Sequence, residues 1–464
     1  ITRTRNMIYR LEAGIDMQFR GGIGMVTPVE EAMDSYKGAL RALRESDSHV
    51  VHITDIPAIA NYDGEYPLKL ENQYFQRGAK ADKEGAAACA NEFFDWMLEH
   101  DGNVRANIEV KVLELPLKKQ WKISLYEQTT RAHAVVRITT EDGIVGFGEA
   151  APSPAFMGET GYTMEVAVNR YLKDAVIGMD VFSTDLIHEK MNSAIYGNYA
   201  AKSAIDMALY DICGKITELP AYRLLGGLYR EKAALSWVVG MQDLDASIEE
   251  AREKLKEGYR VLKVKVGKSP EVDYRLVKRI RDELGEGFPL RLDANQGYNY
   301  STALGIFRRL EEFGLESIEQ PVKRWDIQGM RMLRERLKTP IMADESVSDF
   351  HSAGVVIREQ ACDSVNIKVG KVGGLTMAKK IAACLEAEGL LATAGSNLEV
   401  GIGSAASIHF VASTVNADIP NDMLLGGPLH QHDIIIEDFK VKDGYVEVPQ
   451  KPGLGIEVDE SIFK

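Results

Sequence analysis

The sequence predicts an α/β protein whose C-terminal half is a TIM-like barrel, in which parallel strands are surrounded by helices. Beyond about residue 235, short apolar strands alternate with charged amphipathic helices, which is the pattern of a parallel sheet. There are six or more such units of similar length, which favours a closed barrel over an open sheet. A helix over 246–258, with Asp245 as its expected cap, is typical of the connections. The strands are expected at 262–266, 289–293, 317–319, 340–344, 364–368 and 391–394.

Length and local patterns divide the chain into three regions. A chain of 464 residues is too long for one ordinary core and suggests two or three domains. Residues 1–106 are expected to form an N-terminal α/β extension, whose role the sequence does not indicate. Residues 107–230 should form an α+β domain with a hairpin around the turn at 141–143. Residues 231–434 should form the barrel.

The charge balance limits the partners that the protein can have. The chain has 55 basic and 69 acidic residues, a net charge of −14, which argues against nucleic acid or an anionic membrane as the main partner. A small carboxylate substrate stays open, because a bound cation reverses the local potential. The four cysteines lie neither in CxxC pairs nor at zinc-ligand spacing from a histidine, so buried thiols are expected. No apolar run near the start is long enough for a signal peptide or membrane span, and the cytoplasm is the expected location.

Five charged residues stand at the C-terminal ends of five successive predicted strands. The intervals between them are 28, 26, 25 and 24 residues, each about one βα unit. In a barrel, these positions converge on the face where active sites of this fold are built. Any one of them could be a charged residue that ends a strand and is exposed to solvent. Three acids flanked by two lysines at equivalent positions of five strands are unlikely to occur by chance. The residues are Lys265, Asp293, Glu319, Asp344 and Lys368.

The three acids indicate a metal site. Asp293, Glu319 and Asp344 come from adjacent strands and supply only hard oxygen ligands. Such a set suits one Mg²⁺ ion that keeps open positions for water and substrate, and Mn²⁺ is expected to be able to replace it. Zn²⁺ is disfavoured because no histidine or cysteine accompanies the acids, and Ca²⁺ would need more ligands.

Two lysines alternate with apolar residues along the first of these strands. Lys263 and Lys265 therefore lie on one side of it, where a buried pair is costly unless acids or a metal compensate. Neighbouring cations also lower each other's pKa, and we expect a neutral amine that can act as a base. Lys263 can instead contact a substrate carboxylate and leave the role of base to Lys265.

Lys368 lies four strands after Lys265 and can face it across the barrel mouth, on the opposite side of a bound substrate. One base on each face is what racemisation or epimerisation requires, since one removes the proton and the other returns it. A metal ion offsets the second negative charge that develops when a carboxylate becomes an enediolate. The residues thus predict Mg²⁺-dependent removal of a proton next to a carboxylate, with Lys265, Lys368 and Lys263 as the catalytic lysines.

At these residues the sequence resembles the muconate lactonizing enzyme subgroup of the enolase superfamily. The similarity covers roughly residues 108–462 and includes a capping-domain signature at Gly146–Glu149 and Gly197–Ala204. The barrel motifs, in order, are Lys263-Val-Lys265-Val-Gly267, Asp293-Ala-Asn295, Ile318-Glu-Gln-Pro321, Ala343-Asp-Glu-Ser346 and Asn366-Ile-Lys-Val-Gly370.

The resemblance implies a (β/α)7β barrel and an α+β capping domain, formed by residues 107–230 with about 435–464, that closes over the barrel mouth. It implies the same three metal ligands and the same pair of acid and base lysines. By analogy with family members, a homo-oligomer is expected. Substrate contacts are implied for Phe156, Met157, Tyr196, Asn198, Asn295, Asn397 and Glu399.

The resemblance leaves the step after proton removal open. It implies an isomerase, either a cycloisomerase of the muconate type or a racemase or epimerase of a carboxylate or amino-acid derivative. The alternatives are a dehydratase of the o-succinylbenzoate synthase type and a barrel that serves as a non-catalytic sensor or scaffold. The segments Ala150–Pro154 and Gly158–Thr160 resemble the corresponding segments of dipeptide epimerases. The Asp-x-Asp pair by which those enzymes hold a substrate ammonium is absent from Pro420–Leu424, and Gly427–Leu429 looks more like cycloisomerases.

Overall fold

The computed structural model describes residues 107–124 and 126–463. The predicted N-terminal extension, residues 1–106, lies outside the described residues, and the three domain boundaries remain predictions. The described chain forms an antiparallel sheet with packed helices, followed by a parallel barrel. Among the described helices, none combines the length and the apolar character needed to cross a membrane.

The antiparallel sheet has three strands in the order β1 (Asn107–Lys122), β2 (Glu127–Thr139) and β3 (Val145–Ala150). The predicted hairpin is confirmed, because β2 and β3 pair in continuous register from Thr139 opposite Val145 to Ala134 opposite Ala150. Helices then follow over α5 (Gly161–Ala167), η2 (Val168–Leu172), α6 (Lys173–Val176), α7 (Thr184–Ala194) and α8 (Tyr199–Thr217).

Helix α8 packs very close to this sheet. A Cβ atom at Gly148 in β3 would lie 1.7 Å from the carbonyl oxygen of Ala204, and one at Gly146 would lie 2.4 Å from that of Ala208. Ala204 and Ala208 are one helical turn apart, so a face of small residues on α8 meets the glycines of β3. The glycines of the Gly-Phe-Gly-Glu motif thus permit this close approach.

Replacement of Gly148 by alanine is expected to lower the free energy of unfolding by about 1–3 kcal/mol, the usual cost of overpacking. The new methyl group meets backbone of α8, which has no room to move aside. Thermal or urea unfolding measures the loss. Gly305→Ala in α12 (Tyr300–Leu310) is a matched control, because a Cβ atom there meets nothing within 4 Å. Equal stability of the two variants would contradict the close packing.

Seven parallel strands form the barrel sheet in the order β11-β10-β9-β8-β7-β6-β5. Isolated parallel bridges join Leu235 to Asn421 and Gly395 to Asp422, so residues 421–422 occupy an eighth position between the two edge strands. The predicted TIM-like barrel is therefore confirmed. The strands are β5 (Trp237–Val239), β6 (Leu262–Lys265), β7 (Leu290–Asp293), β8 (Ser317–Glu319), β9 (Ile341–Ala343), β10 (Ser364–Ile367) and β11 (Leu391–Ala394).

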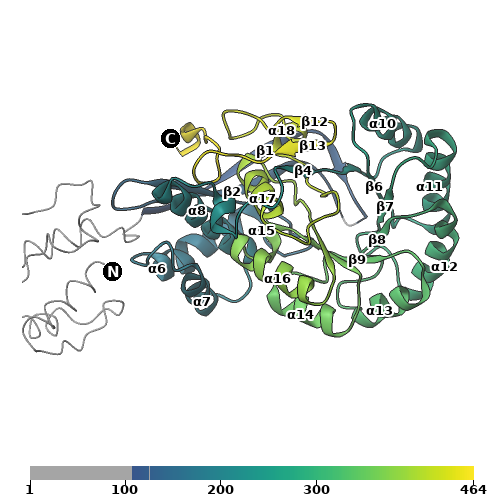
Figure 1. Ribbon diagram of the computed structural model, residues 1–464, viewed down its shortest axis with the longest axis horizontal. Helices are drawn as coiled ribbons and strands as arrows, with labels where there is room; N and C mark the ends of the chain where they lie inside the picture. Colours follow the sequence, from purple (N-terminus) through teal and green to yellow (C-terminus); the bar gives the residue numbers. More distant parts are fainter. Residues whose placement is uncertain (1–106, 125, 464) are drawn as a thin grey trace, which may run out of the picture. The chain divides into compact units, whose positions relative to one another are not determined.

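The connecting helices cover the outer face of the sheet, and Figure 1 shows α10 to α14 arranged along it. Helix α11 illustrates why these segments are helical. The Ser269 side chain caps its first turn, Pro270 occupies the start, and Val277 and Ile280 are buried on one face. The helices are α10 (Leu244–Lys256), α11 (Pro270–Leu284), α12, α13 (Ile327–Arg336), α14 (Phe350–Arg358), α16 (Leu375–Ala387) and α17 (Gly401–Ala412).

The expected cap of the first connecting helix is wrong. The carboxylate of Asp243, not Asp245, accepts the N–H of Ala246 at 2.9 Å, and α10 starts directly after it. Asp245 lies in the first helical turn and pairs with Arg279 on the next helix. Both aspartates suit a helix start, and the extended backbone of Asp243 decides between them.

The C-terminal segment returns to the first sheet. Strand β13 (Tyr445–Glu447) pairs with β12 (Val441–Lys442) on one side and with β4 (Lys232–Ala234) on the other, in a small sheet of its own. In the last turn, η4 (Glu460–Phe463), the guanidinium carbon of Arg137 lies 4.6 Å from the centroid of the Phe463 ring. The end of the described chain thus packs on β2.

Candidate active site

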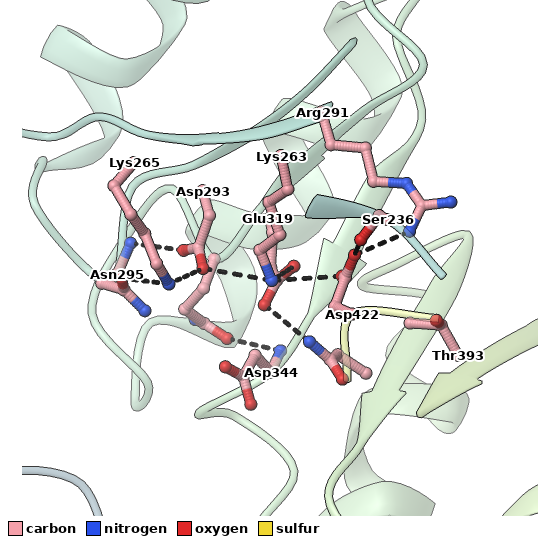
Figure 2. Close-up of polar contacts among 12 residues, drawn as sticks. Ser236, Lys263, Lys265, Arg291, Asp293, Asn295, Glu319, Asp344, Thr393 and Asp422 are labelled. Atoms are coloured by element: carbon pink, nitrogen blue, oxygen red, sulfur yellow. Dashed lines mark hydrogen bonds and ion pairs between the residues drawn. The ribbon is translucent and has the colours of Figure 1, made fainter. Parts of the chain in front are cut away.

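The charged residues predicted at strand ends converge in the structure. Lys265 pairs in register with Asp293, and Asp293 with Glu319, so their side chains leave neighbouring strands at the same level of the barrel. Asp344 and Lys368 directly follow β9 and β10. Figure 2 shows the three acids together with the two lysines of β6.

Both lysines of β6 contact these acids. Lys265 Nζ lies 2.5 Å from Asp293 Oδ2. Lys263 Nζ lies 2.6 Å from Glu319 Oε2 and 3.3 Å from Asp293 Oδ2. Alternation along the strand thus places both amines on the inner side of the barrel, as the sequence predicts.

Asp344 lies between two further lysines. Lys368 Nζ is 2.7 Å from its Oδ2 atom and Lys371 Nζ is 2.7 Å from its Oδ1 atom. Sequence analysis missed Lys371. It lies in the short helix α15 (Val369–Val372), three residues after Lys368, and this spacing of one helical turn is the signal that could have revealed it.

Burial and charge act differently on the acids. Burial raises the pKa of Glu319 and repulsion from Asp293 adds to this, so the pKa reaches about 8 although a lysine is adjacent. Burial acts in the same direction on Asp344, but Lys368 and Lys371 outweigh it and hold the pKa of Asp344 well below its usual range. Glu319 therefore keeps a proton at neutral pH, because burial and the neighbouring carboxylates together outweigh the adjacent lysine.

The donor set fits a hard divalent cation. Asp293, Glu319 and Asp344 are fully buried and offer only carboxylate oxygens. A cation at these acids would compensate the charge that raises the pKa of Glu319. In residues 107–124 and 126–463, no three His, Cys, Asp or Glu side chains are placed ready to hold a metal ion, because these oxygens face lysines. Holding a cation requires the carboxylates to turn toward it.

Lys263 and Lys368 are both protonated at neutral pH. Burial alone lowers the pKa of Lys263, but Asp422 and Glu319 help to raise it well above its ordinary value. Burial also lowers the pKa of Lys368, and Asp344 more than reverses this effect. The expected mutual lowering of the two β6 lysines is therefore not found at Lys263, because carboxylates from several strands surround it. Both amines can donate a proton.

Asp422 is a site residue that sequence analysis missed. It stands at the eighth position of the sheet, where its Oδ2 lies 3.2 Å from Lys263 Nζ and its Oδ1 accepts from Arg291 at 2.9 Å. The Ser236 hydroxyl donates to the same carboxylate. Figure 2 shows this group beside Glu319. The signal available in the sequence was an acid directly before the apolar residues Met423 and Leu424, in a segment too short to be recognised as a strand.

Amide side chains fix the orientation of the acids. Asn366 Nδ2 donates to Glu319 Oε1 at 2.9 Å. Gln320 Oε1 accepts the backbone N–H of Asp344 at 3.1 Å. Both amides are fully buried and both belong to the motifs noted from the sequence, so their place in those motifs could have indicated this role.

A pocket opens above the strand ends, and residues of both the first sheet and the barrel line it. It brings together six of the predicted site residues, namely Phe156, Lys263, Lys265, Asn295, Lys368 and Asn397. The remaining lining residues are Trp121, Ile123, Tyr126, Val238, Asn366, Ser396, Leu398, Asp422 and Leu424. Trp121 and Tyr126 flank the turn between β1 and β2, so this turn, which sequence analysis missed, forms one wall.

Four predicted substrate contacts do not line this pocket. Tyr196 is 91% exposed, and Asn198 stands at the start of α8. Met157 Sδ lies 3.7 Å from Nδ2 of the lining residue Asn397. Glu399 accepts hydrogen bonds from the Asn397 backbone and so holds the pocket loop. Substrate contact by these four residues remains a prediction.

Comparisons with known proteins place this geometry in context. Residues 107–226 match the family described as mandelate racemase/muconate lactonizing enzyme, N-terminal domain, and residues 246–462 match the enolase C-terminal domain-like family. The L-Ala-D/L-Glu epimerase of Clostridium acetobutylicum is 35% identical over 354 residues, 76% of this chain and 98% of that protein. The chloromuconate cycloisomerase of Pseudomonas putida is 31% identical over 357 residues, 76% of this chain and 96% of that protein.

A solved structure is similarly close. The dipeptide epimerase from Enterococcus faecalis V583, complexed with Mg and the dipeptide L-Leu-L-Tyr, has a TM-score of 0.72 and 33% sequence identity. The alignment covers 75% of this chain and 98% of that one. The matched share of the relatives is nearly complete, so the barrel and the first sheet both lie within the similarity.

Proposed function

The chain belongs to the mandelate racemase/muconate lactonizing enzyme family of the enolase superfamily, and from this premise we propose that it removes a proton next to the carboxylate of a small substrate in a Mg²⁺-dependent reaction. It is an isomerase of this superfamily, as are its relatives named epimerase, racemase and cycloisomerase. The observation that carries the proposal is the pair Lys265 and Lys368, which line one pocket above three buried acids.

The two lysines supply an acid and a base. Lys265 ends β6 and Lys368 follows β10, four strands further along the sheet. A substrate between them presents one face of its α-carbon to each amine. One amine takes the proton from that carbon and the other, in its protonated form, returns a proton to the opposite face. This arrangement favours racemisation or epimerisation.

Asp293, Glu319 and Asp344 would hold one Mg²⁺ ion, which Mn²⁺ can replace. When bound, the ion supplies positive charge that offsets the second negative charge developing on a carboxylate as its α-proton leaves. The Lys263 ammonium group adds a fixed positive charge beside these acids. Trp121 and Phe156 line the pocket and exclude water from the amines, which strengthens these interactions.

Cycloisomerisation of a muconate is a second candidate. Three lysines line the pocket, whereas its lining acid, Asp422, is already bound to Arg291 and Lys263. A substrate with two carboxylates is therefore as acceptable electrostatically as one with a single carboxylate. The relatives named chloromuconate cycloisomerase support the same reading.

Exchange of the α-proton in D₂O tests the proposal. The full chain is incubated with Mg²⁺ and a panel of N-acyl amino acids, dipeptides and muconates, and proton NMR follows the signal of the hydrogen next to the carboxylate. We expect exchange in at least one class, its loss in EDTA and its return when Mg²⁺ is added. Absence of exchange throughout the panel, or exchange that persists in EDTA, would contradict the proposal.

Mg²⁺ binding at pH 7 is expected to release about one proton per site, because the cation displaces the proton held by Glu319. The pKa of this acid is about 8, so its proton is present at pH 7 and lost as the pH rises through 8. The apparent Mg²⁺ affinity should rise about tenfold per pH unit below that value and level off above it. Calorimetry at pH 7 in two buffers of different ionisation enthalpy measures the release, and at pH 9 the buffers should agree. Identical heats at pH 7 would contradict this assignment.

A further inference from the structure

Two hydrogen-bond partners direct the Lys265 amine. Its Nζ donates to Asp293 Oδ2 at 2.5 Å and to Asn295 Oδ1 at 2.9 Å, and Figure 2 shows both contacts. Under the proposed function, on which this inference rests, Asp293 would be a ligand of Mg²⁺ and would no longer be free to direct the amine. Asn295 then remains as the side chain that directs the amine.

Asn295 is itself fixed on three sides. Its N–H donates to Asp293 Oδ1 at 2.9 Å, its carbonyl oxygen accepts from Ser124 Oγ at 2.9 Å, and its Nδ2 donates to Glu345 Oε1 at 3.0 Å. Its φ angle is +39°, in the left-handed region that favours glycine. A residue with a side chain keeps such a conformation only where its surroundings impose it, and here they aim the carboxamide at Lys265.

Glu345 decides which end of the Asn295 carboxamide faces the lysine. Its Oε1 accepts from Nδ2, so Oδ1 must point the other way, toward Lys265. Glu345 is only 5% exposed, and its Oε2 has no hydrogen-bond partner in the part of the chain that the structure describes. A buried carboxyl oxygen without a partner is destabilising, so stability alone does not account for an acid at this position.

The opposite lysine has separate hydrogen bonds, and among the described residues only the charge of Glu345, which helps Asp344 to raise the pKa of Lys368, links it to this pair. Lys368 Nζ donates to Asp344 Oδ2 at 2.7 Å and lies 5.4 Å from the centroid of the Phe156 ring. Within the described residues, no hydrogen bond joins it to Asn295 or Glu345. We propose that Asn295, oriented by Glu345, is a positioning residue for Lys265 and therefore supports proton transfer on one face of the substrate only.

The test compares the two faces of one substrate. α-Proton exchange in D₂O is measured for each pure enantiomer, and Lys265→Met and Lys368→Met identify which enantiomer each lysine serves. Asn295→Ala is expected to slow exchange on the Lys265 face by about 10²-fold, the cost of a displaced catalytic group, and to change the Lys368 face less than about threefold. Glu345→Leu removes the acceptor of Asn295 Nδ2 and should also slow the Lys265 face, whereas Glu345→Gln keeps an oxygen that can accept from Nδ2 and should slow it less. Asn397→Ala, the matched control, removes another pocket asparagine and should affect both faces alike.

Each result decides the question. Equal loss on both faces in Asn295→Ala, with a folded thermal melt, would show a general structural role and overturn the inference while leaving the proposed function intact. If Asn295→Ala does not fold, Asn295→Gly carries the comparison, since glycine adopts the positive φ of this position without strain. Absence of exchange in the unsubstituted enzyme would overturn the proposed function, and the inference with it.

Discussion

Replacement of Lys265 by methionine is expected to slow the interconversion of two substrate enantiomers by about 10³-fold or more. The variant keeps the apolar stem and loses the amine, which contributes about 10²–10⁴-fold as a general acid or base. Lys368 cannot compensate, because it follows β10, four strands away from β6. Circular dichroism or polarimetry of a single enantiomer follows the interconversion directly.

Lys268→Met is the matched control for this experiment. Lys268 is three residues further along, in the loop after β6, and is exposed, so its loss should leave the rate unchanged. Lys368→Met should abolish interconversion to the same extent as Lys265→Met. A Lys265→Met enzyme that interconverts the enantiomers at the original rate would remove this lysine from the chemistry.

Replacement of Glu319 by glutamine should raise the Mg²⁺ dissociation constant at least about 10–100-fold. Substitution of residues that merely hold metal ligands in place already weakens metal binding by this factor, so loss of a ligand should weaken it at least as much. The side chain is fully buried between the strands that carry the other two acids, and the substitution replaces the carboxylate that would bind the ion by a neutral amide with little change in shape. Isothermal calorimetry measures the affinity. Activity should fall in parallel and return only partly at high Mg²⁺ concentration.

Glu335→Gln serves as the control for this loss. Glu335 has a side chain 55% exposed, and it pairs with Arg331 on the outer helix α13. Its substitution should leave Mg²⁺ binding unchanged. Unaltered affinity in Glu319→Gln as well would mean that the ion, if bound, is held elsewhere.

The barrel could be predicted from the sequence because its signals are local and repeated. Strand β8 and strand β11 have the predicted bounds, since each occupies its place in the regular alternation of short strands and helices. The register of Lys265, Asp293 and Glu319 follows from the similar lengths of successive βα units. Charged residues at the C-terminal ends of the strands can therefore be predicted to lie close together, because the fold places all these ends on one face of the barrel.

The parts that sequence analysis missed depend on contacts between distant segments. Asn421 and Asp422 form isolated β-bridges to Leu235 and Gly395, and these bridges exist only once the barrel is closed. Trp121 and Tyr126 reach the pocket because the turn after β1 lies over the barrel, where Ser124 Oγ contacts the carbonyl of Asn295. The high pKa of Lys263 results from acids on several strands, which no local pattern reveals.

The most direct test of two opposed lysines is α-proton exchange in D₂O, measured separately for each enantiomer of one substrate with Lys265→Met and with Lys368→Met. We expect complementary results, in which each variant still exchanges the enantiomer served by its remaining lysine and loses exchange of the other by about 10²-fold or more. The lysines do not act on opposite faces of the substrate if both variants lose exchange of the same enantiomer, or if both variants still exchange the α-proton of both enantiomers.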